Sequence, residues 1–347
     1  MAIIQHLIID EFGAFLGKHS ERLIVTKDNQ KIAQAPLLHL ESVLISGLGV
    51  SLSADAVQEC AERGIPIFFL HPNGRPYASL YSSGLVGTIA TRRAQLEAYR
   101  TPLGLALVVA FGLGKLRNQA NLLKYFAKSR KESDPGIYEE LRLCALEIRD
   151  QEIALENLLE RSRTSRQTVI DLRQELMGIE GRAAERYWKA VAHIIPESYG
   201  FPGRTGRNAA DAVNAGLNYG YGVLYGLIER ALLLAGLDPY AGFLHADRPG
   251  KPSMTLDFIE EFRPVVVDRT VFALATKGVA FERQEDGLLS RDFRRLLVER
   301  IHQRLDSTAE FEGKEYPLRI ILQMQARHAA AFLRGERQTY TPFLSSW

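Results

Sequence analysis

The sequence is poor in cysteine and has no long apolar run. Its 347 residues include two cysteines, Cys60 and Cys144, which lie far apart in apolar helical contexts without a CxxC pairing. This pattern fits buried thiols in a reducing compartment better than a disulfide or a zinc site. No uncharged apolar run reaches the roughly 18 residues of a membrane-spanning helix. Asp10 and Glu11 directly follow the first apolar stretch, unlike in a signal peptide. We therefore expect a cytoplasmic protein with no membrane partner.

Net charge is also nearly absent, but the charges are unevenly distributed. The chain carries 43 basic and 41 acidic side chains, a formal net charge of +2, which by itself argues for no polyanionic partner. Between residues 92 and 131, however, the one acidic residue is Glu97, and nine residues are basic: Arg92, Arg93, Arg100, Lys115, Arg117, Lys124, Lys128, Arg130 and Lys131. Such a segment can present a positive field to a polyanion although the whole chain is nearly neutral.

Turn residues and hydrophobic periodicity divide the chain into two parts. Short segments punctuated by glycine predict a β-rich domain over 1–82, with one helix at 53–63. The expected strands are 2–9, 11–16, 21–26, 30–35, 42–46, 65–70 and 76–81. Small residues predict a linker at 83–88, and helical periodicity predicts a larger all-α domain over 89–347. The expected helices are 90–112, 114–130, 136–162, 165–195, 207–236, 255–262, 266–276, 288–306 and 317–335. The predicted fold class is α+β.

Glu180 stands out within one of these helices. It lies in LMGIEGRAAERYW, where Gly178 and Gly181 flank it, and each glycine lowers helix stability by about 1 kcal/mol relative to alanine. Such glycines are tolerated where another group must approach the backbone closely. The alternative is a solvated glutamate beside packing glycines, and this segment alone leaves both interpretations open.

A polar stripe follows one face of the helix predicted at 207–236. Its members recur every three or four positions and are Arg207, Asp211, Asn214, Asn218, Tyr221 and Tyr225. The residues between them are mostly small or apolar, which predicts close packing and a partly buried stripe whose polar groups are hydrogen-bonded. Two roles remain open: a polar network that fixes helix packing, or a lining for the substrate.

The segment GFLHADRPGKPSMTLDFIEEFRP, 242–264, combines a histidine with a pair of carboxylates. His245 follows an apolar turn, and Asp257 and Glu260 lie three residues apart on one face of the next predicted helix. Neighbouring carboxylates repel each other unless a divalent metal or a basic group lies between them. With a third carboxylate from elsewhere, these groups would suit manganese or magnesium rather than structural zinc. The alternative is a non-ligating histidine beside solvated carboxylates. Three basic residues that could meet phosphate surround the same loop: Arg248, Lys251 and Arg263.

Three separated motifs together resemble a known family. The resemblance is to the CRISPR-associated endonuclease/integrase family that carries out spacer acquisition. It is carried by GIPIFFLHPNGRPYASL, LMGIEGRAAERYW and NAGLNYGYGVLYGLIERALLLAGLDPYAGFLHADRPGKPSMTLDFIEEFRPVVVDR. It runs through nearly the whole chain in the expected order. It implies a dimerising N-terminal β domain, a short linker and a C-terminal helical catalytic domain.

The resemblance also implies a metal site. In this family a glutamate in a G-x-E-G helix, a histidine after an apolar turn and an acidic residue on the following helix bind one divalent metal. These positions are Glu180, His245 and Glu260 here. Many members carry aspartate at the last position, where this chain keeps the charge on a longer side chain. Asp257 matches a further acidic position and could assist or bind a second ion, whereas Glu261 should point away. The implied cofactor is Mn²⁺ or Mg²⁺.

The implied activity is phosphodiester chemistry on DNA. A metal held by two carboxylates and an imidazole can activate water, which gives a nuclease, or a DNA 3′-hydroxyl, which gives an integrase. The resemblance favours transesterification that joins the 3′-ends of captured foreign DNA, the protospacer, to the CRISPR repeat array in antiviral defence. The alternatives are a non-catalytic DNA-binding scaffold with the same fold and a metal-dependent phosphohydrolase of small phosphate esters.

The resemblance further implies macromolecular partners. They are double-stranded and branched DNA, a second copy of the chain in a homodimer, and a dimer of the small second CRISPR adaptation protein in a heterohexamer. DNA binding through the phosphate backbone requires dispersed cations and polar groups. The candidates are Arg92, Arg93, Arg207, Asn214, Asn218, Tyr221, Arg248, Lys251 and Arg263.

Overall fold

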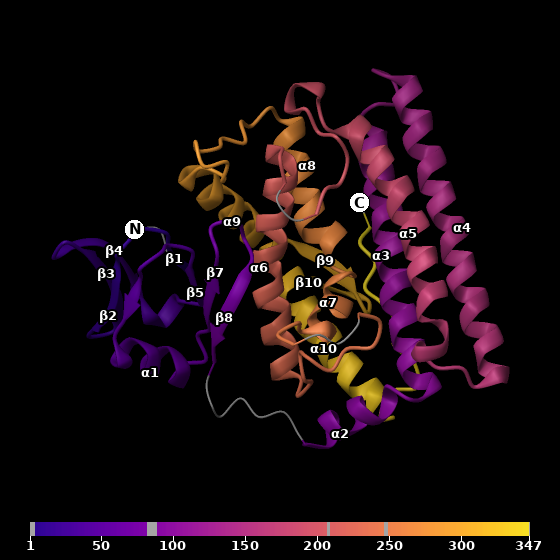
Figure 1. Ribbon diagram of the computed structural model, residues 1–347, viewed down its shortest axis with the longest axis horizontal. Coiled ribbons are helices and arrows are strands. Elements are labelled where there is room, and N and C mark those ends of the chain that lie inside the picture. Colours follow the sequence, from indigo (N-terminus) through magenta and orange to yellow (C-terminus); the bar gives the residue numbers. More distant parts are fainter. Residues whose placement is uncertain (1–3, 82–88, 207–208, 246–248, 347) are drawn as a thin grey trace.

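The computed structural model describes residues 4–81, 89–206, 209–245 and 249–346 (Figure 1). The expected linker at 83–88 and two DNA-binding candidates, Arg207 and Arg248, lie outside the described residues. Most strands gather in the N-terminal part, and the rest of the chain is mostly helical. The predicted α+β class is therefore confirmed.

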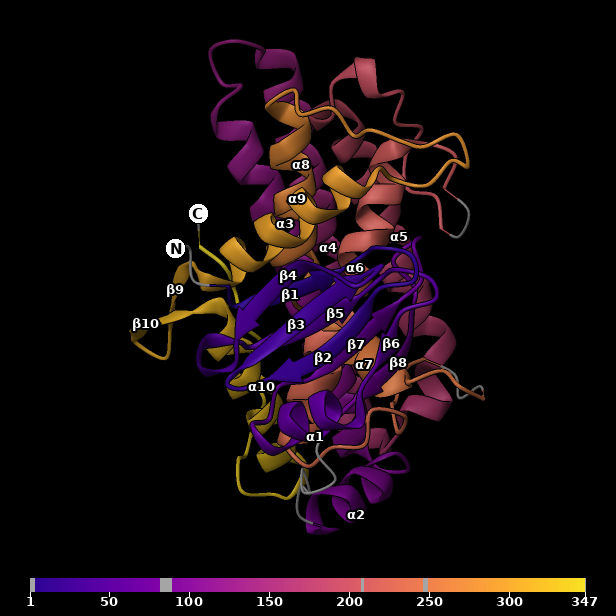
Figure 2. The same cartoon turned by 90° about the vertical axis from the view of Figure 1, so that its left-hand side faces the viewer.

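Two four-stranded sheets form the N-terminal part, and Figure 2 shows them from the front. One has the order β1–β5–β7–β8 and the other the order β4–β3–β2–β6. Helix α1 (Ala54–Glu62) begins after Ser53, whose hydroxyl accepts a hydrogen bond from the Ala56 N–H at 3.1 Å. Buried side chains of the strands form a separate apolar core, which includes Leu16, Leu23 and Val43. The strands are β1 (His6–Ile9), β2 (Phe15–His19), β3 (Arg22–Lys27), β4 (Gln30–Pro36), β5 (Ser42–Ile45), β6 (Ser51–Leu52), β7 (Ile67–Leu70) and β8 (Pro76–Leu80).

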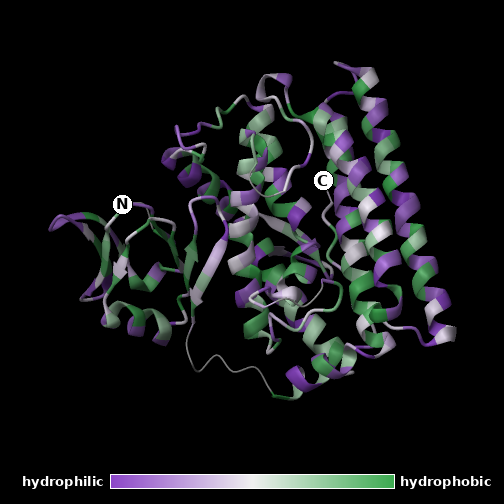
Figure 3. Cartoon of the chain, in the orientation of Figure 1, coloured by the Kyte–Doolittle hydropathy of each residue, from purple (hydrophilic) through white to green (hydrophobic). Residues whose placement is uncertain are grey.

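Three long helices pack side by side at the end of the molecule away from the sheets (Figure 1). They are α3 (Pro102–Lys128), α4 (Pro135–Ser165) and α5 (Val169–Ile194), and each carries both hydrophobic and hydrophilic residues along its length (Figure 3). Helix α6 (Ala212–Leu234) lies between this layer and the sheets. The other helical segments are α7 (Ser253–Ile259), a π-helical turn (Pro264–Asp268), α8 (Arg269–Thr276), α9 (Arg291–Asp306) and α10 (Leu318–Leu333).

Several helix boundaries differ from the prediction, most clearly around Pro102. The pattern predicts helices over 90–112 and 114–130, but α2 (Ile89–Ala98) ends before Pro102, and α3 runs without a break from Pro102 to Lys128. Proline starts a helix more readily than it continues one, and the Thr101 hydroxyl caps α3 by accepting from the Leu103 N–H at 3.3 Å. In the described part of the chain no single helix is long and apolar enough to cross a membrane. Helices α2 and α3 meet both conditions only together, as a pair bent by 90°.

The second part of the chain is not wholly helical, which corrects the all-α expectation. Strands β9 (Thr308–Phe311) and β10 (Lys314–Pro317) form an antiparallel hairpin between α9 and α10. Its two turn residues, Glu312 and Gly313, have φ values of 50° and 76°. Positive φ at both central residues is the geometry that closes a two-residue hairpin. The hairpin falls between the predicted helices 288–306 and 317–335, so it is an addition to them.

Helix α6 joins the two parts of the chain through its glycines. A Cβ atom on Gly222 would lie 1.6 Å from the carbonyl oxygen of Gly74 in the β7–β8 turn. A Cβ atom on Gly226 would lie 2.7 Å from the ring of Phe68 on β7. The close packing predicted for this helix is therefore confirmed, and its small residues bring the β7–β8 hairpin into direct backbone contact with α6.

We predict that Gly222→Ala destabilises the protein by about 3 kcal/mol, because the added methyl group meets backbone that cannot rotate away. The matched control is Gly181→Ala, where the described structure has no atom within 4 Å of the added Cβ. That change should stabilise α5 by about 0.5–1 kcal/mol. Urea unfolding measures both free energies. Equal effects of the two substitutions would contradict the assigned contact.

Candidate functional site

Two glutamates from different helices meet at one lysine. Glu180 lies on α5, Glu260 immediately follows α7, and Lys115 lies on α3. The Lys115 Nζ is 2.8 Å from Glu260 Oε2 and 3.5 Å from Glu180 Oε2. The three side chains are largely buried, with exposed fractions of 14%, 16% and 7% for Lys115, Glu180 and Glu260. The structure therefore brings together two of the three predicted ligands around a cation.

The charge of Glu260 is stabilised from several sides. Burial by itself would raise its pKa, but the guanidinium of Arg263 and the ammonium of Lys115 lower it to about 2, with a further contribution from His245. Arg263 also donates a hydrogen bond to Glu260 through Nη1. Burial likewise acts to lower the pKa of Lys115, yet Glu180 and Glu260 raise it above its ordinary value. The cluster is thus a set of full charges, and His245 is close enough to contribute to it.

His245 is held by Asp257. The Nδ1 of His245 lies 2.6 Å from Asp257 Oδ1, and the same oxygen accepts the backbone N–H of His245 at 3.1 Å. The other oxygen, Oδ2, accepts the N–H groups of Phe243 at 2.6 Å and Leu244 at 3.0 Å. Asp257 is buried, and both its oxygens are used by the loop that carries the histidine. An Nδ1–H donated to Asp257 leaves Nε2 of His245 with a free lone pair.

The loop before α7 is shaped for this contact. A Cβ atom on Gly242 would lie 2.4 Å from the carbonyl carbon of Ser253, so a larger residue would push the loop away from the helix. The Ser253 hydroxyl accepts the Gly242 N–H at 2.9 Å and donates to the Tyr240 carbonyl at 2.6 Å. Arg173 on α5 donates to the Phe243 carbonyl at 3.0 Å. These bonds fix His245 relative to α5 and α7.

Glu261 points away from the cluster, as the sequence led us to expect. Its carboxylate accepts hydrogen bonds from Gln325 Nε2 at 2.8 Å, the Tyr340 hydroxyl at 2.7 Å and the Phe343 N–H at 2.7 Å. Burial raises its pKa to about 7 despite these donors. Asn118 on α3 donates to the Glu261 carbonyl at 3.0 Å. Glu261 therefore anchors the end of α7 to the C-terminal segment.

The polar stripe of α6 holds an arginine that the sequence analysis had not included in it. Arg204 donates to Asn214 Oδ1 at 2.9 Å and to Asn218 Oδ1 at 2.7 Å. Asn214 is fully buried and also donates to the Gly203 carbonyl at 2.8 Å. Of the two roles left open for the stripe, the internal hydrogen-bond network is the one visible here, and DNA contact by Asn214 and Asn218 stays a prediction.

Tyr221 continues the stripe toward the carboxylate cluster. Its ring lies between two guanidinium groups, with Arg263 at 4.8 Å and Arg204 at 5.5 Å from the ring centroid. Its hydroxyl donates to Asp268, which also accepts from the Tyr187 hydroxyl at 2.7 Å. Arg263 is therefore shared between Glu260 and Tyr221, and its contact with DNA phosphate stays a prediction.

The remaining DNA-binding candidates that the structure describes differ in exposure. Arg93 on α2 is exposed and Arg92 is half-buried, as is Lys251 before α7. Sequence reasoning missed Lys115, Arg204 and Asp268 as individual site residues. One feature of the sequence could have identified Lys115 as a site residue: it is the first charge after the uncharged run 102–114.

The donor geometry differs from that of an assembled metal site. Among the described residues, no group of three or more His, Cys, Asp or Glu side chains is arranged closely enough to hold a metal ion. In the cluster around Glu180 and Glu260, an ammonium group lies between the carboxylates. Asp257 and Glu260, expected on one face, have separate partners in His245 and Lys115.

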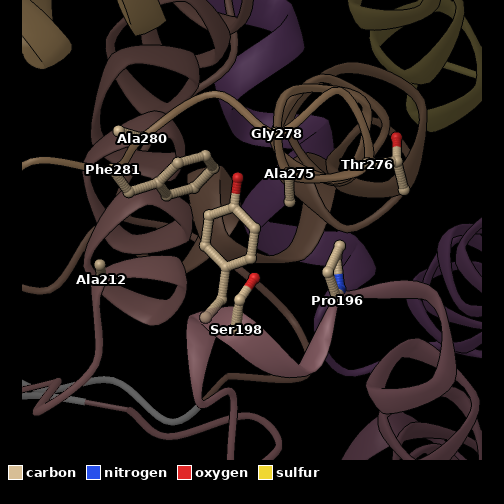
Figure 4. A pocket seen from close by; sticks show the side chains of 9 residues that line it. Pro196, Ser198, Ala212, Ala275, Thr276, Gly278, Ala280 and Phe281 are labelled. Carbon is tan, nitrogen blue, oxygen red and sulfur yellow. The ribbon is translucent and has the colours of Figure 1, made fainter.

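A pocket of about 480 Å³ lies elsewhere, between the segment after α5 and the end of α8 (Figure 4). Phe281 contributes an aromatic wall, and the Tyr199 hydroxyl is already donated to the Val279 carbonyl at 2.7 Å. No lining residue is charged. The lining residues are Pro196, Ser198, Tyr199, Ala212, Ala275, Thr276, Gly278, Ala280 and Phe281.

In both sequence and fold the chain is similar to CRISPR-associated proteins. The family model described as CRISPR associated protein Cas1 matches residues 7–303. A CRISPR-associated endonuclease Cas1 of Archaeoglobus fulgidus is 37% identical over 352 residues, which cover 98% of this chain and 99% of the relative.

Two solved structures share the fold. A casposase bound to integration product matches with a TM-score of 0.80 at 21% identity, covering 97% of this chain and 93% of that chain. A Cas6-RT-Cas1–Cas2 complex matches with a TM-score of 0.73 at 22% identity, covering 99% of this chain and 37% of that chain. At these identities the likeness shows the fold alone.

We predict that the stability of the protein depends on pH through Asp268. Burial raises the pKa of this carboxyl group from 3.8 to about 6. Between these values the folded protein holds a proton that the unfolded chain releases, so the free energy of unfolding falls as pH rises, by up to about 3 kcal/mol. Asp268→Asn removes this titration. The free energy of unfolding of the native protein minus that of the variant should therefore fall from pH 4 to pH 7. A difference that rises instead would show that the tyrosine hydrogen bonds outweigh burial.

Proposed function

This chain belongs to the Cas1 family of CRISPR-associated proteins, and we propose that Glu180, His245 and Glu260 form the centre at which it cuts and joins DNA. The chain is an endonuclease of the integrase type that acts in CRISPR adaptation. The observation that supports this centre best is geometric. Two carboxylates enclose a cation, and His245 is held by Asp257, three residues before Glu260.

The proposed ligands Glu180, Glu260 and His245 are of the types that bind a divalent metal, and two of them already enclose a cation. Cas1 nucleases are metal-dependent in general. The ammonium of Lys115 between Glu180 and Glu260 indicates that the space between these carboxylates accepts a positive charge. Two carboxylates and a neutral imidazole are donors that suit Mn²⁺ or Mg²⁺, and we infer that one of these is the cofactor. When bound, the metal would supply Lewis-acid polarisation of a phosphodiester and activation of the attacking oxygen.

Asp257 has a positioning role in this proposal. Both of its oxygens accept hydrogen bonds from the loop 243–245, so the carboxylate orients His245 and directs Nε2 outward as a ligand. This role fits the contacts of Asp257 better than the binding of a second ion does. Arg263 balances the charge of Glu260 and is in turn held against the ring of Tyr221.

The nucleophile decides the outcome of the reaction. Water as the attacking group gives strand cleavage, and a DNA 3′-hydroxyl gives strand joining. We propose that the chain joins the 3′-ends of a captured protospacer to the CRISPR repeat array, with cleavage as the simpler reaction of the same centre. The similarity in fold to a casposase bound to integration product supports the joining reaction.

The basic stretch 92–131 supports a path for DNA, and we assign Arg92 and Arg93 to it. Arg93 is exposed on α2, whereas Lys115 of the same stretch lies inside the carboxylate cluster. Arg117 and Arg130 are also bonded within the protein, to Glu152 and Glu156 and to the Phe126 and Ile194 carbonyls respectively. The exposed cations of the stretch are the ones we propose for phosphate contacts. Lys251, which precedes α7, is also proposed to contact phosphate, as is Arg248, which lies outside the described residues.

The proposal extends to domains and partners. A separate apolar core within the N-terminal sheets supports the division into a β-rich domain at 1–82 and a helical catalytic domain at 89–347. We propose that the β-rich domain forms the homodimer. The similarity to the Cas1 part of a Cas6-RT-Cas1–Cas2 complex supports assembly with a Cas2-type dimer into a heterohexamer.

The alternative functions have less support. A non-catalytic scaffold has no need for two buried carboxylates whose charges must be balanced. A phosphohydrolase of small esters has little use for a long basic stretch, whereas residues 92–131 carry nine basic side chains and one acidic one. Binding of DNA that is weak and independent of salt would favour the phosphohydrolase.

We predict that His245→Ala abolishes metal-dependent cleavage of branched DNA and supercoiled plasmid, by at least about 100-fold, while DNA binding persists. Asp257→Asn should lower the cleavage activity about 10-fold to 100-fold, because the imidazole remains but its orientation is lost. Activity with Mn²⁺, Mg²⁺ or a chelator is the measurement. His39→Ala, an exposed histidine of the β-rich part, is the matched control. Full activity of His245→Ala would move the centre elsewhere.

We predict that changing Arg92 and Arg93 to glutamate weakens DNA binding. The plot of the logarithm of the DNA-binding constant against the logarithm of salt concentration should become less steep by about 1–2, because each lost phosphate contact reduces its slope by about 0.9. The control reverses Lys277 and Lys314, which are exposed outside the basic stretch. Fluorescence anisotropy at several salt concentrations measures both. An unchanged slope in the Arg92 and Arg93 variant would exclude α2 from the DNA path.

A further inference from the structure

We propose that Lys115 is a resident counter-ion of the two catalytic carboxylates and that a divalent metal enters the centre by displacing its ammonium group. The inference rests on the proposed function and concerns a residue outside the proposed ligand set. It makes Lys115 a residue that sets metal affinity, and through it the order in which metal and DNA bind.

The position of Lys115 is the first argument. Its Nζ lies 2.8 Å from Glu260 and 3.5 Å from Glu180, so it fills the space where a shared metal would lie. The side chain is only 14% exposed and comes from α3, a helix that supplies none of the proposed ligands. An ammonium and a divalent ion cannot use the same carboxylate oxygens at once, because their charges repel at such short range.

The balance of charge is the second argument. Glu180 and Glu260 carry two negative charges, and Lys115 with Arg263 carries two positive charges. These four ion-paired side chains are therefore neutral together before any metal arrives, which lowers their attraction for a cation. Arg263 is fixed, because its guanidinium is bonded to Glu260 and stacked 4.8 Å from the ring centroid of Tyr221. Lys115 has a flexible four-carbon stem and a compact charge, so it is the group that can move.

A DNA phosphate would give the displaced ammonium a new partner. Metal and DNA would then each improve the binding of the other, as thermodynamic linkage requires. Without DNA, the ammonium competes with the metal for Glu180 and Glu260. Removal of the lysine charge should therefore strengthen metal binding in the absence of DNA and weaken the coupling between metal and DNA.

The test is a titration of the full chain with Mn²⁺ in the absence of DNA. The concentration of free Mn²⁺ is measured from its electron paramagnetic resonance signal. We expect Lys115→Met to lower the dissociation constant about tenfold, within the usual range of coupling between two sites. Lys124→Met, an exposed lysine on the same helix, should bind Mn²⁺ as the native protein does. Lys115→Arg keeps the charge and should also remain near the native value. An unchanged or higher dissociation constant for Lys115→Met overturns the inference.

Two further measurements separate the possible failures. Glu180→Gln and His245→Ala should lose Mn²⁺ binding, and if they bind it normally the proposed centre itself is wrong. If they lose it while Lys115→Met is unchanged, only the inference on Lys115 fails. Without metal, the melting temperature of Lys115→Met should be lower than that of the native protein. Addition of Mn²⁺ should raise the melting temperature of the variant more than that of the native protein. If Lys115→Met does not fold, the same titration is made with Lys115→Gln. This variant keeps a hydrogen-bond donor but not the charge.

Discussion

Two carboxylates buried side by side require a positive charge between them, and much of the helical part serves this requirement. Glu180 and Glu260 come from α5 and the end of α7, and α3 supplies Lys115 between them. Desolvation opposes every charge in the cluster, but the mutual attraction outweighs it, so that the pKa of Glu260 falls to about 2. The same charge pattern that holds the helices together prepares the place where a divalent cation would bind.

The second requirement is that the end of α7 stays in one orientation. Asp257 binds the loop on one side of the helix, and Glu261 binds Gln325, Tyr340 and Phe343 on another. Glu260 lies between these two anchors in the sequence and is thereby directed at α3 and α5. Three neighbouring acidic residues of one segment thus have three different tasks: orienting a histidine, facing the cation and anchoring the C-terminal segment.

Helix α6 connects the cluster with the sheets. On one face Asn214 and Asn218 hold Arg204, and Tyr221 holds Asp268 and the guanidinium of Arg263. Other positions of the helix are glycines, of which Gly222 lies against the backbone of the β7–β8 turn. A change in how the N-terminal sheets are docked would therefore reach Arg263 through a single helix.

The sequence by itself determined the local elements and the motif residues. Alternation and turn residues predicted most strands of the N-terminal sheets but missed β6 and misplaced β2. The Ser53 cap predicted α1, and the three motifs identified Glu180, His245 and Glu260 as candidates. These features depend on residues close together in the chain. Tertiary structure alone decided that Lys115 meets Glu180, 65 positions away, that both oxygens of Asp257 serve the His245 loop, and that the α6 polar stripe forms an internal network. Such contacts depend on which helix faces pack together, and periodicity within one helix carries no information about its neighbour.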